Sequence, residues 1–426
     1  MHHFDYSNGA LHAEAVPLAR IAAEVGTPVY VYSSATFERH YRVFCEGLGV
    51  PGAKVFYAVK ANGNLGVLMT LAKLGAGADV VSEGEIRKSL AAGIPASKIV
   101  FSGVGKTAEE LAFAVESGLY QVNVESEGEL EALSAIASAQ GKVQALVLRV
   151  NPEIGAGGHA KITTGGAADK FGVSFSEAER LYAKAAMMPG LAIKGLAVHI
   201  GSQIMEFSAL EAAFLKLRGV VEALRGAGFS VSRLDLGGGV GIPYEIAYPY
   251  THGPEHLAAY GAMVRKVTAG LDVELGFEPG RVIAGNAGIL LAKVIYVNIR
   301  ADRRFLVLDA AMNDLIRPAM YDAYHDIWPV KEPQPGAPRL SYDVVGPVCE
   351  SSDTFATERL LPEMQPGDLV AFKTAGAYGA SMASTYNQRL LVPEVLVKGA
   401  DYAITRPRQS YEALIAQDKA PSWFNI

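Results

Sequence analysis

From about residue 55 onward, short apolar runs rich in β-branched and aromatic residues alternate with amphipathic segments of helical period. Such runs are typical of buried strands, and the segments between them are typical of helices that connect parallel strands. Counted from Val55, the pattern predicts about eight strands. The expected strands are 55–60, 78–82, 98–101, 120–124, 143–150, 193–199, 233–236 and 273–277, and the first helices between them are 65–74, 83–92, 108–117 and 127–139.

This alternation predicts a barrel, and its end predicts a second domain. Eight is the number of strands that closes a parallel β/α barrel. The alternation stops near Glu278, and the β-like runs beyond it are separated by turns rich in Pro and Gly, which indicates an antiparallel β domain. The expected fold class is α/β plus all-β, with a TIM-like barrel over 34–280 and a β domain formed by 1–33 and 281–426. Strands are expected at 28–33, 290–297, 305–308, 369–372 and 390–397, and a further helix at 35–48.

Composition narrows the class of protein. The chain has 426 residues, half of them hydrophobic, a net charge of -6 and no basic run, so no nucleic-acid partner is expected. Cys45 and Cys349 are the only cysteines, which predicts no disulfide framework and fits a reducing compartment. No apolar run approaches the roughly twenty residues of a membrane span, and the first residues do not resemble a secretory signal. We expect a cytoplasmic protein of enzyme size that does not bind membranes.

Lys60 stands where the first barrel strand should end. Polar turn residues follow it, so it lies at the carboxyl end of a core strand, where α/β proteins place their chemistry. A lysine held against apolar surroundings loses solvation of its ammonium form, and its neutral amine can attack a carbonyl. The alternative is an ordinary solvated lysine at a strand end.

Other reactive or polar residues follow the remaining strands. Residues after the strands of a barrel share one face, so they can meet although they are distant in sequence. Individually, a histidine could belong to the core, a glycine run could form a tight turn, and a carboxylate could cap a loop. Together they indicate a site. The residues at these positions are Lys60, Ser82, Asn151, His199, Gly237, Gly238, Gly239 and Glu278.

The glycine run 237–239 indicates a phosphate site. Barrels commonly bind phosphate with the loops after their last two strands, where backbone N–H groups can approach an anion without obstruction by Cβ. Ile242 replaces the third glycine of a dinucleotide fingerprint, and Val100 replaces the first glycine of a P-loop. No metal-ligand spacing of His or Cys occurs. A lysine for an aldehyde, glycines for a phosphate and a carboxylate for a ring nitrogen together describe pyridoxal 5'-phosphate.

The motifs resemble those of the diaminopimelate decarboxylases, which belong to the alanine-racemase-like (fold type III) pyridoxal-phosphate enzymes. The resemblance covers almost the whole chain. Arg317 with Tyr321, and a glutamate directly after Cys349, point to diaminopimelate within that class. The stretches that carry the resemblance are YAVKAN (57–62), ADVVSEGE (78–85), KFG (170–172), HIGSQ (199–203), LGGG (236–239), EPGR (278–281), RPAMY (317–321), GPVCE (346–350) and GAY (376–378).

The resemblance implies a role for each of these residues. Lys60 would form a Schiff base with the cofactor, His199 would stack on its ring and Glu278 would face its pyridine nitrogen, where a carboxylate keeps the nitrogen protonated. Cys349 would reprotonate the substrate carbon. The further cofactor-binding residues implied are Ser202, Gly238, Gly239, Pro279, Gly280, Arg281 and Tyr378, and the substrate-binding residues implied are Arg281, Arg317, Tyr321, Glu350 and Tyr378.

The expected reaction is decarboxylation of meso-diaminopimelate at its D-centre to L-lysine, the last step of lysine biosynthesis. One alternative is decarboxylation of ornithine, lysine or arginine, and another is a non-catalytic pyridoxal-phosphate homologue. Substrates of the first alternative lack the distal carboxylate, so an extra arginine near them would be an unpaired cation. The resemblance also implies a homodimer in which Cys349 and Glu350 reach the partner's cofactor.

Overall fold

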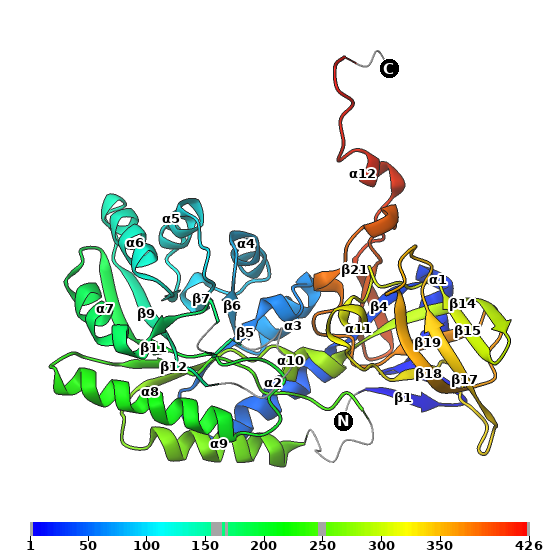
Figure 1. Cartoon of the computed structure of the whole chain (residues 1–426), viewed down its shortest axis with the longest axis horizontal. Coiled ribbons are helices and arrows are strands. Elements are labelled where there is room, and N and C mark those ends of the chain that lie inside the picture. Colours follow the sequence, from blue (N-terminus) through cyan, green and yellow to red (C-terminus); the bar gives the residue numbers. More distant parts are fainter. Residues whose placement is uncertain (1–2, 155–163, 167–168, 246–252, 424–426) are drawn as a thin grey trace. The chain divides into compact units, whose positions relative to one another are not determined.

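The computed structural model describes residues 3–154, 164–166, 169–245 and 253–423, and these residues form two compact units. The first, the barrel unit, contains residues 37–243 and 253–284. The second, the β unit, contains 3–36, 244–245 and 285–423. Both units are drawn in Figure 1.

Eight parallel strands form a closed barrel, as the alternation predicted. Each strand pairs in parallel with its neighbour, and Phe277 of the last strand pairs with Val55 of the first, which closes the ring. A two-residue strand, β10 (Val173–Ser174), pairs in parallel with β9 outside the ring. The barrel strands are β5 (Lys54–Ala58), β6 (Gly77–Val80), β7 (Ile99–Phe101), β8 (Gln121–Val124), β9 (Gln144–Asn151), β11 (Leu191–Ala197), β12 (Arg233–Asp235) and β13 (Glu274–Phe277).

Side chains cap the first turn of four helices of this unit, α3 to α6. Ser82 and Ser126 accept hydrogen bonds from the N–H groups of Glu85 and Glu129, so both stretches of sequence SEGE start a helix in the same way. Bounds were predicted for five of these helices. Two of the five have the predicted bounds, and each of the other three differs by one residue at one end. The helices are α2 (Ser34–Leu48), α3 (Leu65–Lys73), α4 (Glu83–Ala91), α5 (Ala108–Ser117), α6 (Glu127–Ala139), α7 (Phe175–Met187), α8 (Ser208–Gly226), α9 (Pro254–Thr268) and the short α10 (Arg281–Ala284).

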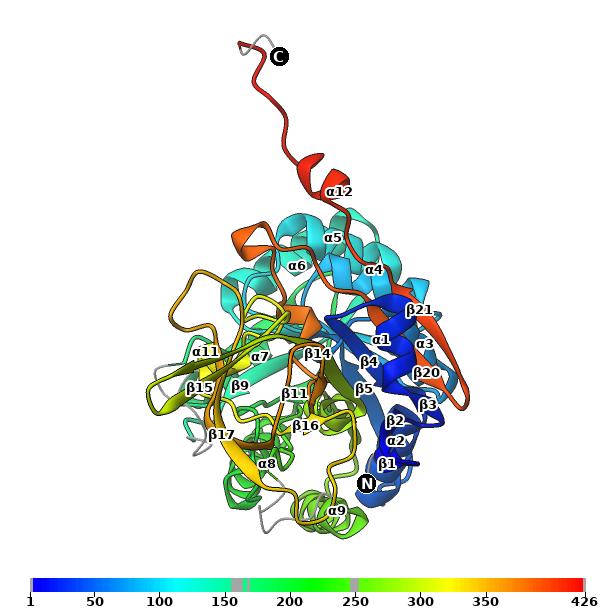
Figure 2. The ribbon, with the colours of Figure 1, turned by 90° about the vertical axis from the view of Figure 1, so that its right-hand side faces the viewer.

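The β unit is built on a mixed sheet. Its order is β18-β17-β15-β14-β4-β20-β21, with β19 paired to β14 and β16. Figure 2 shows β14, β15 and β17 of this sheet. The strands are β4 (Val29–Ser33), β14 (Gly288–Arg300), β15 (Arg303–Leu308), β16 (Ile327–Pro329), β17 (Arg339–Val345), β18 (Thr354–Pro362), β19 (Leu369–Phe372), β20 (Glu394–Lys398) and β21 (Asp401–Arg406).

This sheet confirms the predicted class and corrects its pairing. The pairs β4–β20 and β15–β17 are parallel, because long stretches of chain separate their members and can carry each strand back in the same direction. The predicted run 390–397 begins as a strand only at Glu394, and β16, β17 and β18 were not predicted. The remaining elements are β1 (Phe4–Ser7), β2 (Ala10–Ala13), β3 (Val16–Pro17), α1 (Leu18–Val25), α11 (Arg317–Tyr321) and α12 (Tyr411–Ile415).

The core of the β unit explains why N-terminal residues belong to it. Every residue of β4 is buried, so this strand is covered on both faces. Val29 and Val31 pack in one cluster with Ile289 and Leu291 of β14. Strand β4, from the N-terminal part of the chain, therefore completes a sheet whose other strands lie more than 250 residues later.

Candidate active site

Lys60 lies just beyond β5, in the 3-10 turn η1 (Val59–Ala61). Its Nζ is 2.6 Å from Oδ2 of Asp79, which β6 places next to Ala58 through the parallel register. The Lys60 side chain is 36% exposed, whereas the Asp79 side chain is fully buried. The predicted apolar surroundings are therefore wrong, because the lysine is paired with a carboxylate. To act as a nucleophile the amine must first lose a proton, and Asp79 is the adjacent acceptor.

The second oxygen of Asp79 is a further hydrogen-bond acceptor beside Lys60. Oδ1 is buried and has no hydrogen-bond partner among the residues that the structure describes. Buried carboxylate oxygens are nearly always hydrogen-bonded, because burial without a partner is costly. An orphaned acceptor beside Lys60 fits a site that is completed by a bound polar molecule.

His199 lies two residues beyond β11 and contacts the glycine run. Its Nδ1 accepts a hydrogen bond from the N–H of Gly238 at 3.1 Å, so the ring proton is on Nε2. Burial, together with the positive charges of Arg149 and Lys60, holds the pKa of His199 well below its usual value. The ring is therefore neutral at pH 7, and a neutral aromatic face is suited to stacking on a cofactor ring.

The glycine run 237–239 comes close to neighbouring loops. A Cβ on Gly238 would lie 2.2 Å from the carbonyl oxygen of Glu278, and one on Gly239 would lie 2.7 Å from that of Gly201. The N–H groups of Gly237 and Gly238 already bond to Asp235 and to His199, so the loop cannot offer these two donors to a phosphate. The absence of Cβ atoms allows Gly238 and Gly239 to pack directly against the backbone of Glu278 and Gly201.

Glu278 follows β13 and is buried among polar side chains. Its Oε1 accepts hydrogen bonds from Nδ2 of Asn123 at 3.0 Å and from Oγ of Ser102 at 3.3 Å. Burial and the nearby carboxylates of Asp235 and Asp79 raise the pKa of Glu278 well above its usual value. The raised pKa favours the protonated form of this carboxyl group, and a carboxyl group in this place could share its proton with a pyridine nitrogen.

The hydrogen bonds continue from Glu278 across the barrel interior to Asp235 on β12. Gln121 of β8 donates to Asn123 at 2.8 Å and to Oδ2 of Asp235 at 3.3 Å. Burial raises the pKa of Asp235 to about 6. Sequence reasoning missed Asp79, Ser102, Gln121, Asn123 and Asp235; their signal is a polar residue inside or just after an otherwise apolar strand.

Arg281 and Ser202, which the resemblance implies as cofactor-binding residues, contact each other in the barrel unit. Arg281 begins α10 and is 7% exposed, and its Nη2 donates to Oγ of Ser202 at 3.1 Å. The carbonyl of Pro279 accepts a hydrogen bond from the N–H of Ala58, which ties the loop containing Pro279 and Gly280 to the strand before Lys60. Two rim residues instead have local partners: Ser82 caps α4, and Asn151 bonds to Glu153 and Gly166.

The other predicted residues lie in the β unit. Arg317 and Tyr321 are the first and last residues of α11, and Arg317 is buried. Cys349 and Glu350 lie in the exposed connection between β17 and β18. The N–H of Cys349 donates to Oδ1 of Asn387, and Glu350 accepts from the hydroxyl of Tyr386 at 3.3 Å.

Tyr378 has a strained backbone. Its φ is +56°, a conformation that large side chains rarely adopt. The next residue is Gly379, where a Cβ would lie 2.7 Å from the hydroxyl of Tyr30. Such strain is common at ligand sites, where the surrounding structure maintains it.

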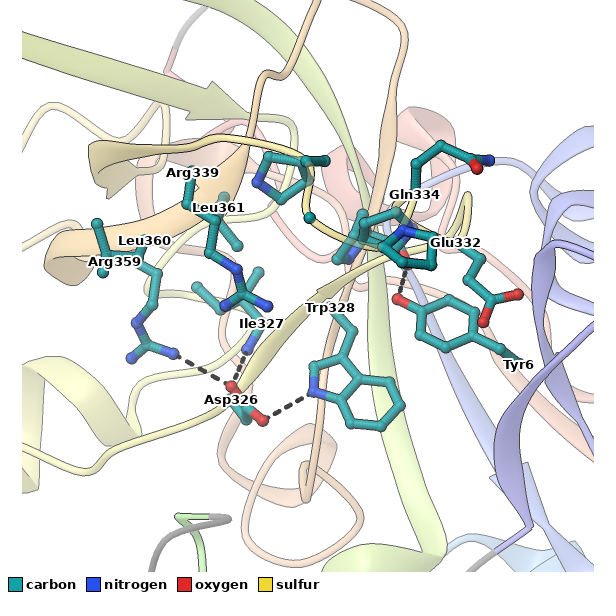
Figure 3. Close-up of a pocket in the computed structure, with 16 residues that line it drawn as sticks. Tyr6, Asp326, Ile327, Trp328, Glu332, Gln334, Arg339, Arg359, Leu360 and Leu361 are labelled. Carbon is teal, nitrogen blue, oxygen red and sulfur yellow. Dashed lines mark hydrogen bonds and ion pairs between the residues drawn. The ribbon is translucent and has the colours of Figure 1, made fainter.

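A separate pocket of about 590 Å³ opens in the β unit (Figure 3). None of the predicted site residues lines it. Asp326 accepts a hydrogen bond from Nε1 of Trp328 at 2.8 Å, and its Oδ1 lies 3.6 Å from Nη1 of Arg359. These two charged groups of the pocket are therefore paired with each other.

No helix in the described part of the chain is long and apolar enough to cross a membrane.

Comparison with known proteins identifies relatives of the whole chain. Residues 34–285 match the pyridoxal-binding domain of the pyridoxal-dependent decarboxylases. The diaminopimelate decarboxylase of Zymomonas mobilis is 47% identical over 99% of both chains. Among solved structures, diaminopimelate decarboxylase from M. jannaschi is 33% identical with a TM-score of 0.92 over 99% of this chain and 98% of that one. The enzyme from Helicobacter pylori complexed with L-lysine is 36% identical with a TM-score of 0.89 over 94% of this chain and 98% of that one.

Proposed function

Because the chain belongs to the pyridoxal-dependent decarboxylases, and among them to the diaminopimelate decarboxylases, we propose that it converts meso-2,6-diaminopimelate to L-lysine and carbon dioxide. The observation that carries this proposal is the similarity to diaminopimelate decarboxylases along both units. The barrel alone would fit several amino-acid decarboxylases. The β unit, which carries Arg317, Tyr321 and Glu350, supports diaminopimelate as the substrate.

The barrel residues fit pyridoxal 5'-phosphate. Lys60 would hold its aldehyde carbon, the loop 237–239 would receive its phosphate, and the neutral ring of His199 would cover one face. Glu278 would face the pyridine nitrogen, where a carboxylate would keep that nitrogen protonated. When bound, the cofactor supplies an electron sink for the electron pair that carbon dioxide leaves behind.

In the reaction, the bond between the α-carbon and the carboxylate carbon of the D-centre breaks, and a proton replaces the carboxylate. We assign this proton to the thiol of Cys349, which is exposed in the isolated chain and so can meet a substrate. Arg281, Arg317 and Tyr321 would bind substrate carboxylate, since a guanidinium offers two parallel donors. Glu350 would face the distal ammonium group, and Tyr378 would contact both cofactor and substrate.

Substrate choice would depend mainly on Arg317. Lysine, ornithine and arginine lack a second carboxylate, so Arg317 would find no substrate carboxylate to bind at the distal end. The test is to measure the release of carbon dioxide from diaminopimelate, lysine, ornithine and arginine, each supplied separately. We expect diaminopimelate to be decarboxylated at a kcat/KM at least about 100-fold above the others. Equal turnover of lysine would point to a basic-amino-acid decarboxylase, and no turnover to a non-catalytic homologue.

We also propose that the enzyme is a homodimer with shared sites. The predicted residues divide between the two units, and Cys349 and Glu350 are exposed at a loop of the β unit. A two-fold interface would let each subunit provide this loop to its partner. Lys60→Ala and Cys349→Ala dimers should each be nearly inactive. After unfolding and refolding together, half of the dimers are mixed and each has one intact site, so activity should return to roughly a quarter of wild type.

The control for that experiment is the mass of the refolded species. If mixed dimers form and activity stays at background, both groups act within one chain and the shared site is refuted. A sample of monomers that nevertheless decarboxylates diaminopimelate would refute the dimer itself.

A further inference from the structure

The guanidinium of Arg317 is held by two aromatic residues of the β unit. Its Nη1 lies 2.7 Å from Nε2 of His325. Its central carbon lies 4.5 Å from the ring centroid of Tyr244, and the rings of Tyr244 and His325 meet edge to face with centroids 5.4 Å apart. Arg317 is 6% exposed and His325 is 1% exposed. His325 therefore holds the guanidinium at one edge, and Tyr244 covers one of its faces.

The chemistry of these groups determines the state of the histidine. Arginine is a donor only and stays charged in proteins, so Nε2 of His325 must accept the hydrogen bond. Nδ1 of the same ring lies 2.8 Å from the carbonyl oxygen of Lys373, which is an acceptor only, so Nδ1 carries the proton. The ring is thus a neutral Nδ1–H tautomer.

The position of His325 is fixed from its backbone as well. Nη1 of Arg359 donates to the carbonyl oxygen of His325 at 3.0 Å. Asp322, at φ +50°, ends α11 in a left-handed conformation and turns the chain so that residue 325 returns to residue 317. Backbone and side-chain contacts together therefore aim one ring nitrogen at the guanidinium.

We propose that His325 is a positioning residue that orients Arg317 toward the distal carboxylate of the substrate, with Tyr244 stacked on the guanidinium as the second support. This inference rests on the proposed function, because it concerns the carboxylate that Arg317 would bind there. The hydrogen bond to a neutral nitrogen leaves the full charge of the guanidinium for the substrate. A carboxylate in place of His325 would instead neutralise Arg317 and compete with the substrate.

Two substitutions separate the two ends of the ring. Gln in place of His325 puts its amide oxygen near the position of Nε2 and keeps an acceptor for Arg317. Asn in the same place reaches only as far as Nδ1, so it keeps the donor to Lys373 and loses that acceptor. His12→Asn is the control, because His12 contacts the carbonyl of Ala10 and none of the groups around Arg317.

The readout is a pair of ligands that differ only by the carboxylate. L-lysine, the product, keeps the distal carboxylate, whereas 1,5-diaminopentane lacks it. We expect His325→Asn to weaken inhibition by L-lysine and to raise the KM for diaminopimelate, each roughly 10- to 100-fold, with kcat and inhibition by 1,5-diaminopentane nearly unchanged. His325→Gln should remain within about threefold of wild type.

The outcomes distinguish this inference from the proposed function. Suppose that wild type turns over diaminopimelate but His325→Asn weakens inhibition by both ligands equally; His325 then does not act through Arg317. The same conclusion follows if His325→Gln has the melting temperature of wild type but does not restore the KM and the inhibition by L-lysine. If wild type does not turn over diaminopimelate, the proposed function itself fails. Loss of folding in His325→Asn alone would leave His325→Gln and Tyr244→Leu to decide, since Tyr244→Leu should also weaken L-lysine selectively.

Discussion

The candidate residues of the barrel unit and those of the β unit are held in different ways. In the barrel, Lys60 is paired with Asp79, and Glu278 is hydrogen-bonded to Asn123 and Ser102. In the β unit, Cys349 and Glu350 lie exposed on a loop. Buried charges need partners, so the barrel has to provide them before any ligand binds. The exposed loop has no such constraint and can be adapted to a substrate.

Arg317 combines features of both groups. It lies in the β unit, yet it is buried and hydrogen-bonded as the barrel residues are. A residue that recognises charge must be oriented in advance, because reorganisation during binding would reduce the free energy gained. The comparison therefore predicts that substitutions at buried, partnered residues alter binding and stability, whereas substitution of the exposed thiol alters the chemical step.

Substitution of Cys349 should give the largest effect on turnover. We expect Cys349→Ala to lower kcat by about 10²–10⁴-fold, the usual contribution of a general acid, with little change in KM. Cys45→Ala is the matched control, because Cys45 is the other free cysteine and lies on α2. A loss of activity below threefold in Cys349→Ala would show that another group delivers the proton.

Removal of Arg317 should affect substrates unequally. Arg317→Ala should cost about 2–5 kcal/mol of transition-state binding for diaminopimelate, measured from kcat/KM, because it leaves a substrate carboxylate without its partner. The loss for lysine as a substrate should be much smaller, since lysine bound for decarboxylation has its one carboxylate at the reacting centre and none at the distal end. Arg20→Ala on α1 is the surface control. Equal losses on both substrates would indicate that Arg317 has only a structural role.

The smallest effect expected is a pH-dependent change in stability of the cofactor-free protein. The pKa of Asp235 is raised from 3.8 to about 6, so the folded state binds this proton more tightly than the unfolded state does. The stabilisation is full below about pH 3.8 and is lost as the pH rises through about 6. An asparagine in place of Asp235 cannot ionise, so the Asp235→Asn variant does not lose stability in this way.

Denaturation of Asp235→Asn and wild type at pH 5 and pH 8 measures this difference. The variant should gain stability relative to wild type by about 1–3 kcal/mol on going from pH 5 to pH 8. Asp302→Asn, at an exposed turn between β14 and β15, should show no such change. A variant that loses stability relative to wild type as the pH rises would reverse the assignment.

Much of the barrel could be predicted from the sequence because its strands are buried on both faces and its helices are regular. The bounds of α5 and α6 agree with the periodicity, and the positions of Lys60, His199 and Glu278 follow from where strands end. The residues that contact these side chains could not be predicted from the sequence. Asp79 contacts Lys60 through the register of β5 and β6, and a single strand's pattern contains no information about its neighbour.

The β unit was less predictable. Strands β17 and β18 are largely exposed on one face and carry charged residues, so they do not form apolar runs. The parallel pairs β4–β20 and β15–β17 join segments distant in sequence. His325 and Tyr244 gave no local signal, because their meeting at Arg317 depends on tertiary structure.

If the barrel holds pyridoxal 5'-phosphate covalently through Lys60, as we propose, borohydride reduction followed by peptide mapping will locate the cofactor on that residue. Reduction should fix a pyridoxyl group on the peptide that contains Lys60, and Lys60→Ala should remain unlabelled under the same conditions. Lys106 is the internal control, since it is buried in an ion pair with Glu129 in the same unit. A label on Lys106 or any other lysine, or no label in an enzyme that binds the cofactor, would contradict the account.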